Sequence, residues 1–362
     1  MQFATKYFFR FDWFVFIFAC SLATIGLLMI YGIDAARGSG DLFQFKKQLL
    51  AVCIGFITTL FISLVDYRQL RNYALAIYVG GLGMLALALP FGTTNVNGGK
   101  WFVIGSLSFQ PVEIAKVILV LFLAAYISKF SRGRMSWLVF IGSGLTTFLY
   151  ALLILMQPDF GSAMVLIASW MAIVLFCGLP KHAWWILGVG ALIVAIGVWN
   201  FGLKPYQKDR ITSFIHPTDK LGSAYNVNQA NIAFGSGGWL GKGVGEGTQA
   251  RLRFLPESSN DFIFAVIGEE LGFFGVCVVL ILFGLLFRGV IRIAKNSGDG
   301  FAGIMLIGFV AIIAFHVLIN AGMNVGIMPV TGIPLPFLSA AASSVVAMFI
   351  CMGLVESVAI NS

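Results

Sequence analysis

The stretch FLPESSNDFIFAVIGEELGF (residues 254–273) joins a polar turn to an apolar run and carries four carboxylates in a chain with only fifteen acidic residues. These four are Glu257, Asp261, Glu269 and Glu270. A carboxylate inside a membrane span is costly unless it faces protein, a water-filled cavity or a cation. The stretch therefore predicts a polar site at the mouth of a membrane-spanning helix.

The composition is typical of a polytopic membrane protein. Hydrophobic residues make up 59% of the 362 residues and charged residues 10%, whereas a soluble domain carries roughly 25% charged residues. The apolar runs are continuous and do not alternate, which favours helices over a barrel. All five cysteines lie within apolar runs without a CxxC pair, so we predict neither disulfides nor cysteine metal ligands. The basic residues are scattered between the runs, which argues against nucleic-acid binding.

We expect an all-α polytopic membrane protein with about ten transmembrane helices, forming a single domain over residues 1–362. Each expected span is close to the ~20 residues that cross a bilayer. The first is longer than the core of a signal peptide, so we expect it to be retained. The expected spans are 12–33, 45–65, 72–91, 110–130, 136–156, 161–179, 183–203, 263–287, 301–325 and 337–358.

The connections between the expected spans predict the orientation. Eleven Lys and Arg residues lie in the short connections of one side and four in those of the other, so the positive-inside rule places both termini in the cytoplasm. Residues 204–262 then form a large extracytoplasmic loop between the seventh and eighth spans. We expect this loop to be ordered, because it contains aromatics and a glycine-rich segment. That segment, 235–247, lacks the pattern of a P-loop, so no nucleotide site is predicted.

Three carboxylates of the opening stretch have more than one interpretation. Asp261 opens the expected eighth span, where it is a helix N-cap, a general base or both. Glu269 lies about 12 Å deeper along that helix. We expect Glu269 and Glu270 to shape a cavity or to pair with a buried cation, and an ion pair is the simplest explanation for Glu270.

Three further segments place polar or irregular elements at the same outer side. Glu113 and Lys116 are three residues apart on one helix face, as a salt bridge or as the wall of a polar cavity. Asp159 is predicted to cap the sixth span. Three prolines interrupt NAGMNVGIMPVTGIPLPFLS (320–339), and non-helical backbone at that depth must border protein or water.

These motifs resemble those of the SEDS family (shape, elongation, division and sporulation), in order from the first span to the last. The GIPLPF version of the last motif is similar to that of the elongation branch, RodA, rather than the division branch, FtsW. The segments that carry the resemblance are WFVIGSLSFQPVEIAK (101–116), YQKDRI (206–211), YNVNQANIAFGSGGWLGKG (225–243), LPESSNDFIFAVIGEELG (255–272) and NAGMNVGIMPVTGIPLPF (320–337).

The resemblance implies a peptidoglycan glycosyltransferase of the bacterial cytoplasmic membrane, which polymerises lipid II at the outer face during cell elongation. A class B penicillin-binding protein and the elongation machinery would be its partners. Asp261 matches the proposed catalytic residue of the family, and Trp101, Glu113 and Lys116 match functionally important positions. The chain departs from the family at 340–342, where Ala-Ala-Ala replaces Tyr-Gly-Gly, and at Lys100, where Arg is usual.

In the mechanism that we expect, Asp261 takes the proton of the acceptor sugar hydroxyl. Basic residues or a divalent cation offset the charge of the pyrophosphate leaving group, and the candidates are Arg210, Lys100 and Lys116. The expected cavity residues are Trp101, Glu113, Lys116, Lys100, Arg210, Asp159 and Glu269. The alternatives are a lipid II flippase, a division-specific polymerase and a scaffold that only positions a transpeptidase.

Overall fold

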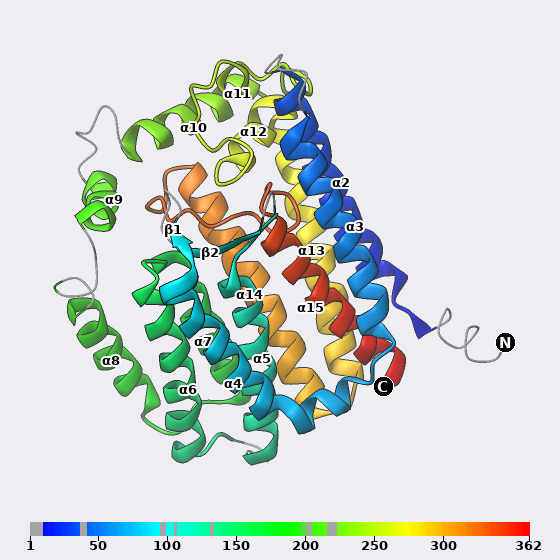
Figure 1. Cartoon of the computed structure of the whole chain (residues 1–362), viewed down its shortest axis with the longest axis vertical. Helices are drawn as coiled ribbons and strands as arrows, with labels where there is room; N and C mark the ends of the chain where they lie inside the picture. The colour runs from blue at the N-terminus through cyan, green and yellow to red at the C-terminus, as the bar shows by residue number, and fades with distance from the viewer. Residues whose placement is uncertain are drawn as a thin grey trace. The chain divides into compact units, whose positions relative to one another are not determined.

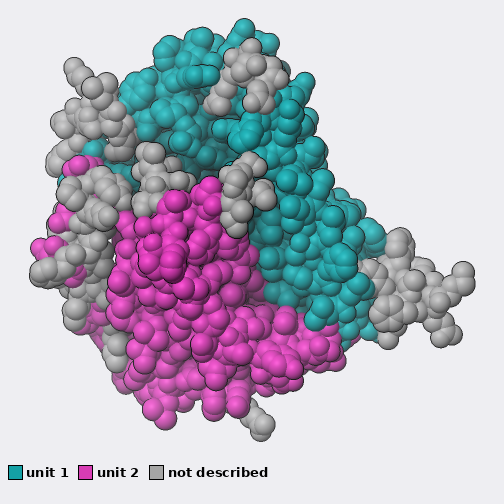
Figure 2. Space-filling view, in the orientation of Figure 1, with its two compact units in different colours: residues 1–65, 210–293, 316–361 teal, residues 66–209, 294–315, 362 magenta. Residues whose placement is uncertain are grey.

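The computed structural model describes residues 10–36, 42–94, 99–104, 107–130, 134–197, 200, 205–215 and 223–362, and most of them are helical (Figure 1). The contacts divide the chain into two compact units (Figure 2). Unit 1 comprises residues 1–65, 210–293 and 316–361, and unit 2 comprises residues 66–209, 294–315 and 362. That residues 1–362 form a single domain stays a prediction.

The long helices follow the apolar runs of the sequence, and shorter helices lie in the expected loop 204–262. Unit 1 contains α2 (Trp13–Ala36), α3 (Phe43–Ser63), α10 (Ser223–Gly237), α11 (Thr248–Arg251), α12 (Ile263–Glu270), most of α13 (Gly272–Asn296) and α15 (Ala342–Asn361). Unit 2 contains α4 (Tyr67–Phe91), α5 (Pro111–Phe130), α6 (Trp137–Met156), α7 (Phe160–Cys177) and α8 (Ala183–Gly197). The boundary between the units falls within α9 (Pro205–Ile215) and α14 (Gly300–Asn324).

Within the described residues, nine helices are long and apolar enough to cross a membrane, which confirms the prediction of a multi-pass helical protein. The expected seventh span, 183–203, corresponds to α8, whose 15 residues are followed by positions outside the described part of the chain. The expected loop 204–262 contains α9, α10 and α11, and only part of it is described.

The eighth expected span, 263–287, is wrong as a continuous helix. The chain forms the short helix α12, turns at Leu271 and begins the spanning helix α13 at Gly272, which has a φ of +67°. A Cβ atom at Gly272 would lie 2.3 Å from the backbone nitrogen of Gly241, so the glycine also permits close approach of another segment. Glu269 and Glu270 therefore precede the spanning helix and do not lie inside it.

A small antiparallel sheet, in the order β1-β2-β3, occupies a segment for which we predicted only loop. Its strands are β1 (Thr93–Thr94), β2 (Lys100–Ile104) and β3 (Leu107–Phe109), with Thr93 opposite Trp101 and Phe102 opposite Phe109. Aromatic and β-branched residues in KWFVI favour a strand. The sheet fixes the backbone of Trp101 and Lys100 in unit 2.

Close helix packing in unit 1 supports the irregular segment that follows α14. A Cβ atom at Gly55 of α3 would lie 2.4 Å from the Phe349 ring of α15, so the absence of a side chain lets these helices approach. The Thr59 hydroxyl donates a hydrogen bond of 2.8 Å to the carbonyl of Phe349. On α2, a Cβ atom at Gly26 would lie 2.6 Å from the Cα of Leu338. The Pro-rich segment is thus seated directly on α2.

Candidate functional site

Asp261 lies in the turn that leads into α12 and is only 7% exposed. Its neighbours Leu255, Phe262 and Ala265 belong to a buried apolar cluster. The N-cap of α12 is Phe262, and no side chain caps this helix, so the prediction that Asp261 is the N-cap is wrong. The Asp261 carboxyl is therefore buried without serving as a helix cap.

Burial decides the protonation of this carboxyl group. Removal from water disfavours the charged form and is the largest cause that raises the pKa of Asp261 to about 7. The nearby carboxylate of Glu257 raises the pKa further, whereas the guanidinium of Arg210 lowers it. A carboxyl group with a pKa near neutrality can accept a proton and release it again, as a general base requires.

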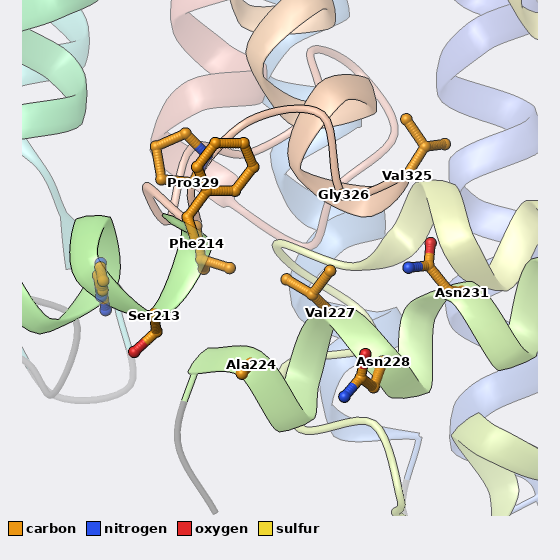
Figure 3. A pocket seen from close by; sticks show the side chains of 11 residues that line it. Ser213, Phe214, Ala224, Val227, Asn228, Asn231, Val325, Gly326 and Pro329 are labelled. Atoms are coloured by element: carbon orange, nitrogen blue, oxygen red, sulfur yellow. The ribbon is translucent and has the colours of Figure 1, made fainter. Parts of the chain in front are cut away.

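A cavity of about 190 Å³ lies between α9, α10 and the segment after α14, and all of its lining belongs to unit 1 (Figure 3). Its polar lining residues are Arg210, Ser213, Asn228 and Asn231, and Phe214 adds an apolar face. Arg210 thus lines the cavity and also acts electrostatically on Asp261. Amide and hydroxyl groups among apolar walls suit a ligand with both polar and apolar surface.

Glu269 holds the glycine-rich segment in place. Its Oε1 atom accepts hydrogen bonds from the Lys242 ammonium at 2.8 Å and from the backbone N–H and hydroxyl of Thr248 at 2.8 and 2.9 Å. The backbone N–H of Gln249 also donates to this carboxylate. Of the two roles expected for Glu269, pairing with a cation is the one observed, and the partner Lys242 is partly exposed and not fully buried. These donors, which come from the ammonium and the backbone of one segment, give Glu269 a structural role.

Glu270 has a different environment one residue later. It is 1% exposed, and its carboxyl accepts hydrogen bonds from the backbone at Gly245 and Gly247. Burial is the largest cause that raises its pKa to about 7. Within the described residues it forms no ion pair, so the predicted ion pair is replaced by these backbone contacts.

Unit 2 contains its own buried charge cluster. The Lys116 ammonium lies 2.8 Å from Glu113, with both side chains almost fully buried, which confirms the predicted salt bridge. Asp159 caps α7 as predicted, accepting hydrogen bonds from the backbone and hydroxyl of Ser162. Gln110 donates to the same carboxylate at 3.1 Å. Burial raises the pKa of Asp159, and Lys116 opposes that shift.

Lys100 and Trp101 are held by the small sheet. The Lys100 ammonium donates to the carbonyl of Gly92 at 3.1 Å, where it compensates the negative end of α4. The carbonyl of Trp101 accepts a hydrogen bond from the Thr93 hydroxyl. This contact assigns Lys100 a structural partner and gives no support to its expected role at a leaving group.

The predicted site residues fall into two sets. Asp261, Arg210 and Glu269 belong to unit 1, where the first two interact and Glu269 has separate partners. Trp101, Lys100, Glu113, Lys116 and Asp159 belong to unit 2. In the described part of the chain, no group of three or more His, Cys, Asp or Glu residues is arranged to hold a metal ion.

Sequence reasoning missed four asparagines. Asn228 and Asn231 line the cavity, and Asn320 and Asn324 donate to the backbone of Asp261. The last two did carry a signal. Two amides one turn apart on a largely apolar helix need hydrogen-bond partners when they are buried.

Comparison with known proteins agrees with this architecture. The profile of the family FTSW_RODA_SPOVE, described as "Cell cycle protein", matches residues 12–362. Stage V sporulation protein E of Bacillus subtilis is 35% identical over 93% of each chain. The probable peptidoglycan glycosyltransferase FtsW of Tolumonas auensis is 36% identical over 91% of this chain and 86% of its own. For the peptidoglycan glycosyltransferase MrdB of Escherichia coli K12 the identity is 31%, over 93% and 91%.

Two solved structures are also similar to the chain. One comes from work on "Structural coordination of polymerization and crosslinking by a peptidoglycan synthase complex", with a TM-score of 0.80, 30% identity and coverage of 96% of this chain and 97% of that one. The rod shape determining protein RodA of Thermus thermophilus has a TM-score of 0.71 and 28% identity, with 96% of each chain covered.

The raised pKa of Asp261 predicts a pH-dependent stability difference. The pKa rises from an ordinary 3.8 to about 7, so this group contributes most stability below pH 4, and the contribution is lost as the pH rises through 7. Asp261→Asn has no buried carboxylate, so we expect it to exceed the wild type at pH 8 by up to about 4 kcal/mol. Thermal unfolding in detergent at pH 4 and pH 8 measures the difference, which should be small at pH 4. A variant less stable than the wild type at pH 8 contradicts this account.

Proposed function

Because the chain belongs to the family of cell cycle proteins that includes FtsW, RodA and SpoVE, we propose that it acts as a peptidoglycan glycosyltransferase with Asp261 as the general base. The substrate would be lipid II, a disaccharide linked through pyrophosphate to a polyprenyl lipid. The raised pKa of the buried Asp261 carboxyl, on which the cavity residue Arg210 acts electrostatically, is the observation that carries this proposal.

The reaction exchanges one bond to the anomeric carbon of the donor for another. A hydroxyl oxygen of the acceptor sugar forms the new bond, and the bond to the pyrophosphate breaks, with the electron pair leaving on the pyrophosphate oxygen. The acceptor hydroxyl releases its proton to Asp261. Because pyrophosphate is a good leaving group, the larger need is for a base that activates the hydroxyl.

The burial of Asp261, its raised pKa and the charge of Arg210 support this role. The turn carries the carboxyl in a buried position, yet a pKa of about 7 leaves a large fraction ionised at neutral pH. Burial also keeps the carboxylate poorly hydrated, which strengthens its attraction for a proton. Arg210 lowers the pKa and so keeps part of the population ready to accept one.

The cavity supplies a place for the charged part of the donor. Arg210 is its cationic residue, and a guanidinium matches the geometry of phosphate oxygens. The amides of Asn228 and Asn231 could hydrogen-bond sugar hydroxyls. We therefore assign charge compensation at the leaving group to Arg210.

In unit 2, we keep Trp101, Glu113, Lys116 and Asp159 as proposed substrate-binding residues, and none of them lines the cavity of unit 1. Lys116 is already paired with the buried Glu113, and Asp159 is hydrogen-bonded by Gln110, which supports a preorganised wall more than a mobile charge. A divalent cation stays an alternative to the basic residues for leaving-group charge.

We also propose a membrane location, an orientation and a partner for the protein. The protein would span the bacterial inner membrane with both termini in the cytoplasm and Asp261 on the outer side. A class B penicillin-binding protein is the expected partner, and a similar solved structure is described as part of a peptidoglycan synthase complex. The sequence GIPLPF (332–337) supports the elongation role over the division role.

The test of the base is a polymerisation assay with purified protein, lipid II and the cognate transpeptidase. Asp261→Asn should bind lipid II with unchanged affinity and make no glycan strands, because an amide cannot accept the proton. Asp66→Asn, which changes an aspartate that caps α4 through the backbone N–H of Arg68, is the control and should keep the wild-type rate. Glycan strands of normal length from Asp261→Asn would remove this residue from the mechanism.

The neighbours of Asp261 predict opposite shifts of the pH profile. Glu257 raises the pKa of Asp261, so Glu257→Gln should move the acid limb of the rate profile to lower pH. Arg210 lowers that pKa, so Arg210→Gln should move the limb to higher pH. Initial rates at saturating lipid II between pH 5 and pH 9 measure both shifts. Acid limbs that move in the same direction in the two variants would rule out Asp261 as the titrating group.

A further inference from the structure

Three consecutive carbonyl groups of the Asp261 turn accept hydrogen bonds from two distant segments of unit 1, residues 339–340 and α14. The carbonyl of Ser259 accepts from the backbone N–H of Ala340 at 2.8 Å. The carbonyl of Asn260 accepts from the hydroxyl of Ser339 at 2.7 Å. The carbonyl of Asp261 accepts from two side-chain amides, those of Asn320 and Asn324, each at 2.9 Å.

The donors of these bonds are themselves buried and braced. Asn320, Asn324 and Ser339 have no exposed surface. The Asn320 amide also donates to the carbonyl of Ile333 at 2.8 Å, so it joins the Asp261 turn to the Pro-rich segment. The Asn324 side-chain oxygen accepts from the backbone N–H of Ala265 at 3.1 Å. Asn324 therefore contacts the chain on both sides of Phe262.

Ser339 is joined to the same turn by its own hydrogen bonds. Its hydroxyl accepts a hydrogen bond from the backbone N–H of Leu335 at 2.8 Å while it donates to Asn260. Its carbonyl accepts from the side chain of Gln48 on α3 at 2.8 Å. The turn is thus linked through side chains to α14, to the Pro-rich segment and to α3.

We propose that Asn320, Asn324 and Ser339 are positioning residues, which fix the backbone of residues 259–261 so that the Asp261 carboxyl is held at the reacting hydroxyl. This inference rests on the proposed function, in which Asp261 is the base. A carbonyl oxygen has two lone pairs, and at Asp261 both are matched by amides from one helix. The pair therefore restrains the direction of the peptide plane as well as its position, and the side chain follows that plane.

The energetics of the environment favour this role over ordinary packing. An apolar residue of similar size would pack in α14 without requiring partners, whereas a buried amide must be satisfied. Displacement of a catalytic group by about 1 Å can reduce a rate on the order of 100-fold. Positioning of the Asp261 carboxyl is therefore a sufficient physical reason for the amides of Asn320 and Asn324 on α14.

The experiment compares Asn320→Ala, Asn324→Ala and Ser339→Ala with a matched control, in full-length protein with lipid II as substrate. The control is Thr59→Val, which removes one buried side-chain hydrogen bond to a backbone carbonyl elsewhere in unit 1. Each asparagine variant keeps the other amide on the Asp261 carbonyl, so each should fold. Thermal unfolding should place all variants close to the control.

A positioning role predicts that kcat falls on the order of 10- to 100-fold while KM for lipid II changes less than about threefold. The acid limb of the rate profile should also move to lower pH, because a loosened turn admits water to the Asp261 carboxyl. Thr59→Val should change neither. In an Asp261→Glu background, where the carboxylate is already displaced, the asparagine substitutions should cost much less than in the wild type.

Two results overturn the inference separately from the proposed function. If Asp261→Asn abolishes polymerisation while the asparagine and Ser339 variants match Thr59→Val in kcat and pH profile, positioning is wrong and the base assignment stands. If Asp261→Asn keeps the wild-type rate, the base assignment fails and the inference fails with it. Should one asparagine variant not fold, the other and Ser339→Ala decide the question by the same readouts.

Discussion

The turn that contains Asp261 depends on one constraint: polar groups removed from water must find partners inside the protein. Its backbone meets the constraint through the side chains of Asn320, Asn324 and Ser339. The Asp261 carboxyl meets it in part by binding a proton, which is why its pKa lies near 7. The backbone carbonyls of residues 259–261 are hydrogen-bonded, and the turn holds the Asp261 carboxyl in an environment that disfavours its charged form. Carboxyl groups with such raised pKa values are common at catalytic sites.

The stretch 254–273 divides its carboxylates according to their surroundings. Glu269 accepts several hydrogen bonds and an ammonium, and so it stabilises the segment around Lys242 and Thr248. Glu270 is buried against backbone N–H groups at Gly245 and Gly247. Asp261 instead faces the influence of Arg210, which lines the cavity. These three acidic residues lie within ten positions of one another, and their contacts decide their roles. Glu269 and Glu270 have structural roles, and Asp261 has the proposed chemical role.

Much of this architecture could be predicted from the sequence. Apolar runs and helix-spaced charges predicted most spans, the Glu113–Lys116 pair and the cap at Asp159, because these depend on neighbours within a few residues. The break at Gly272 and the small sheet were missed, since each depends on a segment distant in the sequence or on weak local preference.

The same limit applies to the candidate site. Asp261 stands out because it lies in an acidic stretch of an apolar chain and in a motif that resembles the family's. The neighbouring sequence does not distinguish a helix cap from a buried base. The roles of Asn320 and Asn324 require knowledge that the carbonyl of Asp261, about sixty residues away in the chain, lies beside their helix. The partner of Glu269 likewise came from a glycine-rich segment 27 residues earlier. Long-range hydrogen bonds were therefore the part that sequence patterns could not supply.

The most direct measurement is an infrared difference titration of the purified protein, comparing the wild type with Asp261→Asn between about pH 5 and pH 9. The account predicts a protonated-carboxyl band in the wild type that disappears with a midpoint near pH 7 and is missing from the variant. Glu270 also has a raised pKa, but its band is present in both samples and cancels in the comparison. A wild type and variant with the same protonated-carboxyl signal across this range would contradict the claim that Asp261 is a buried base poised near neutrality.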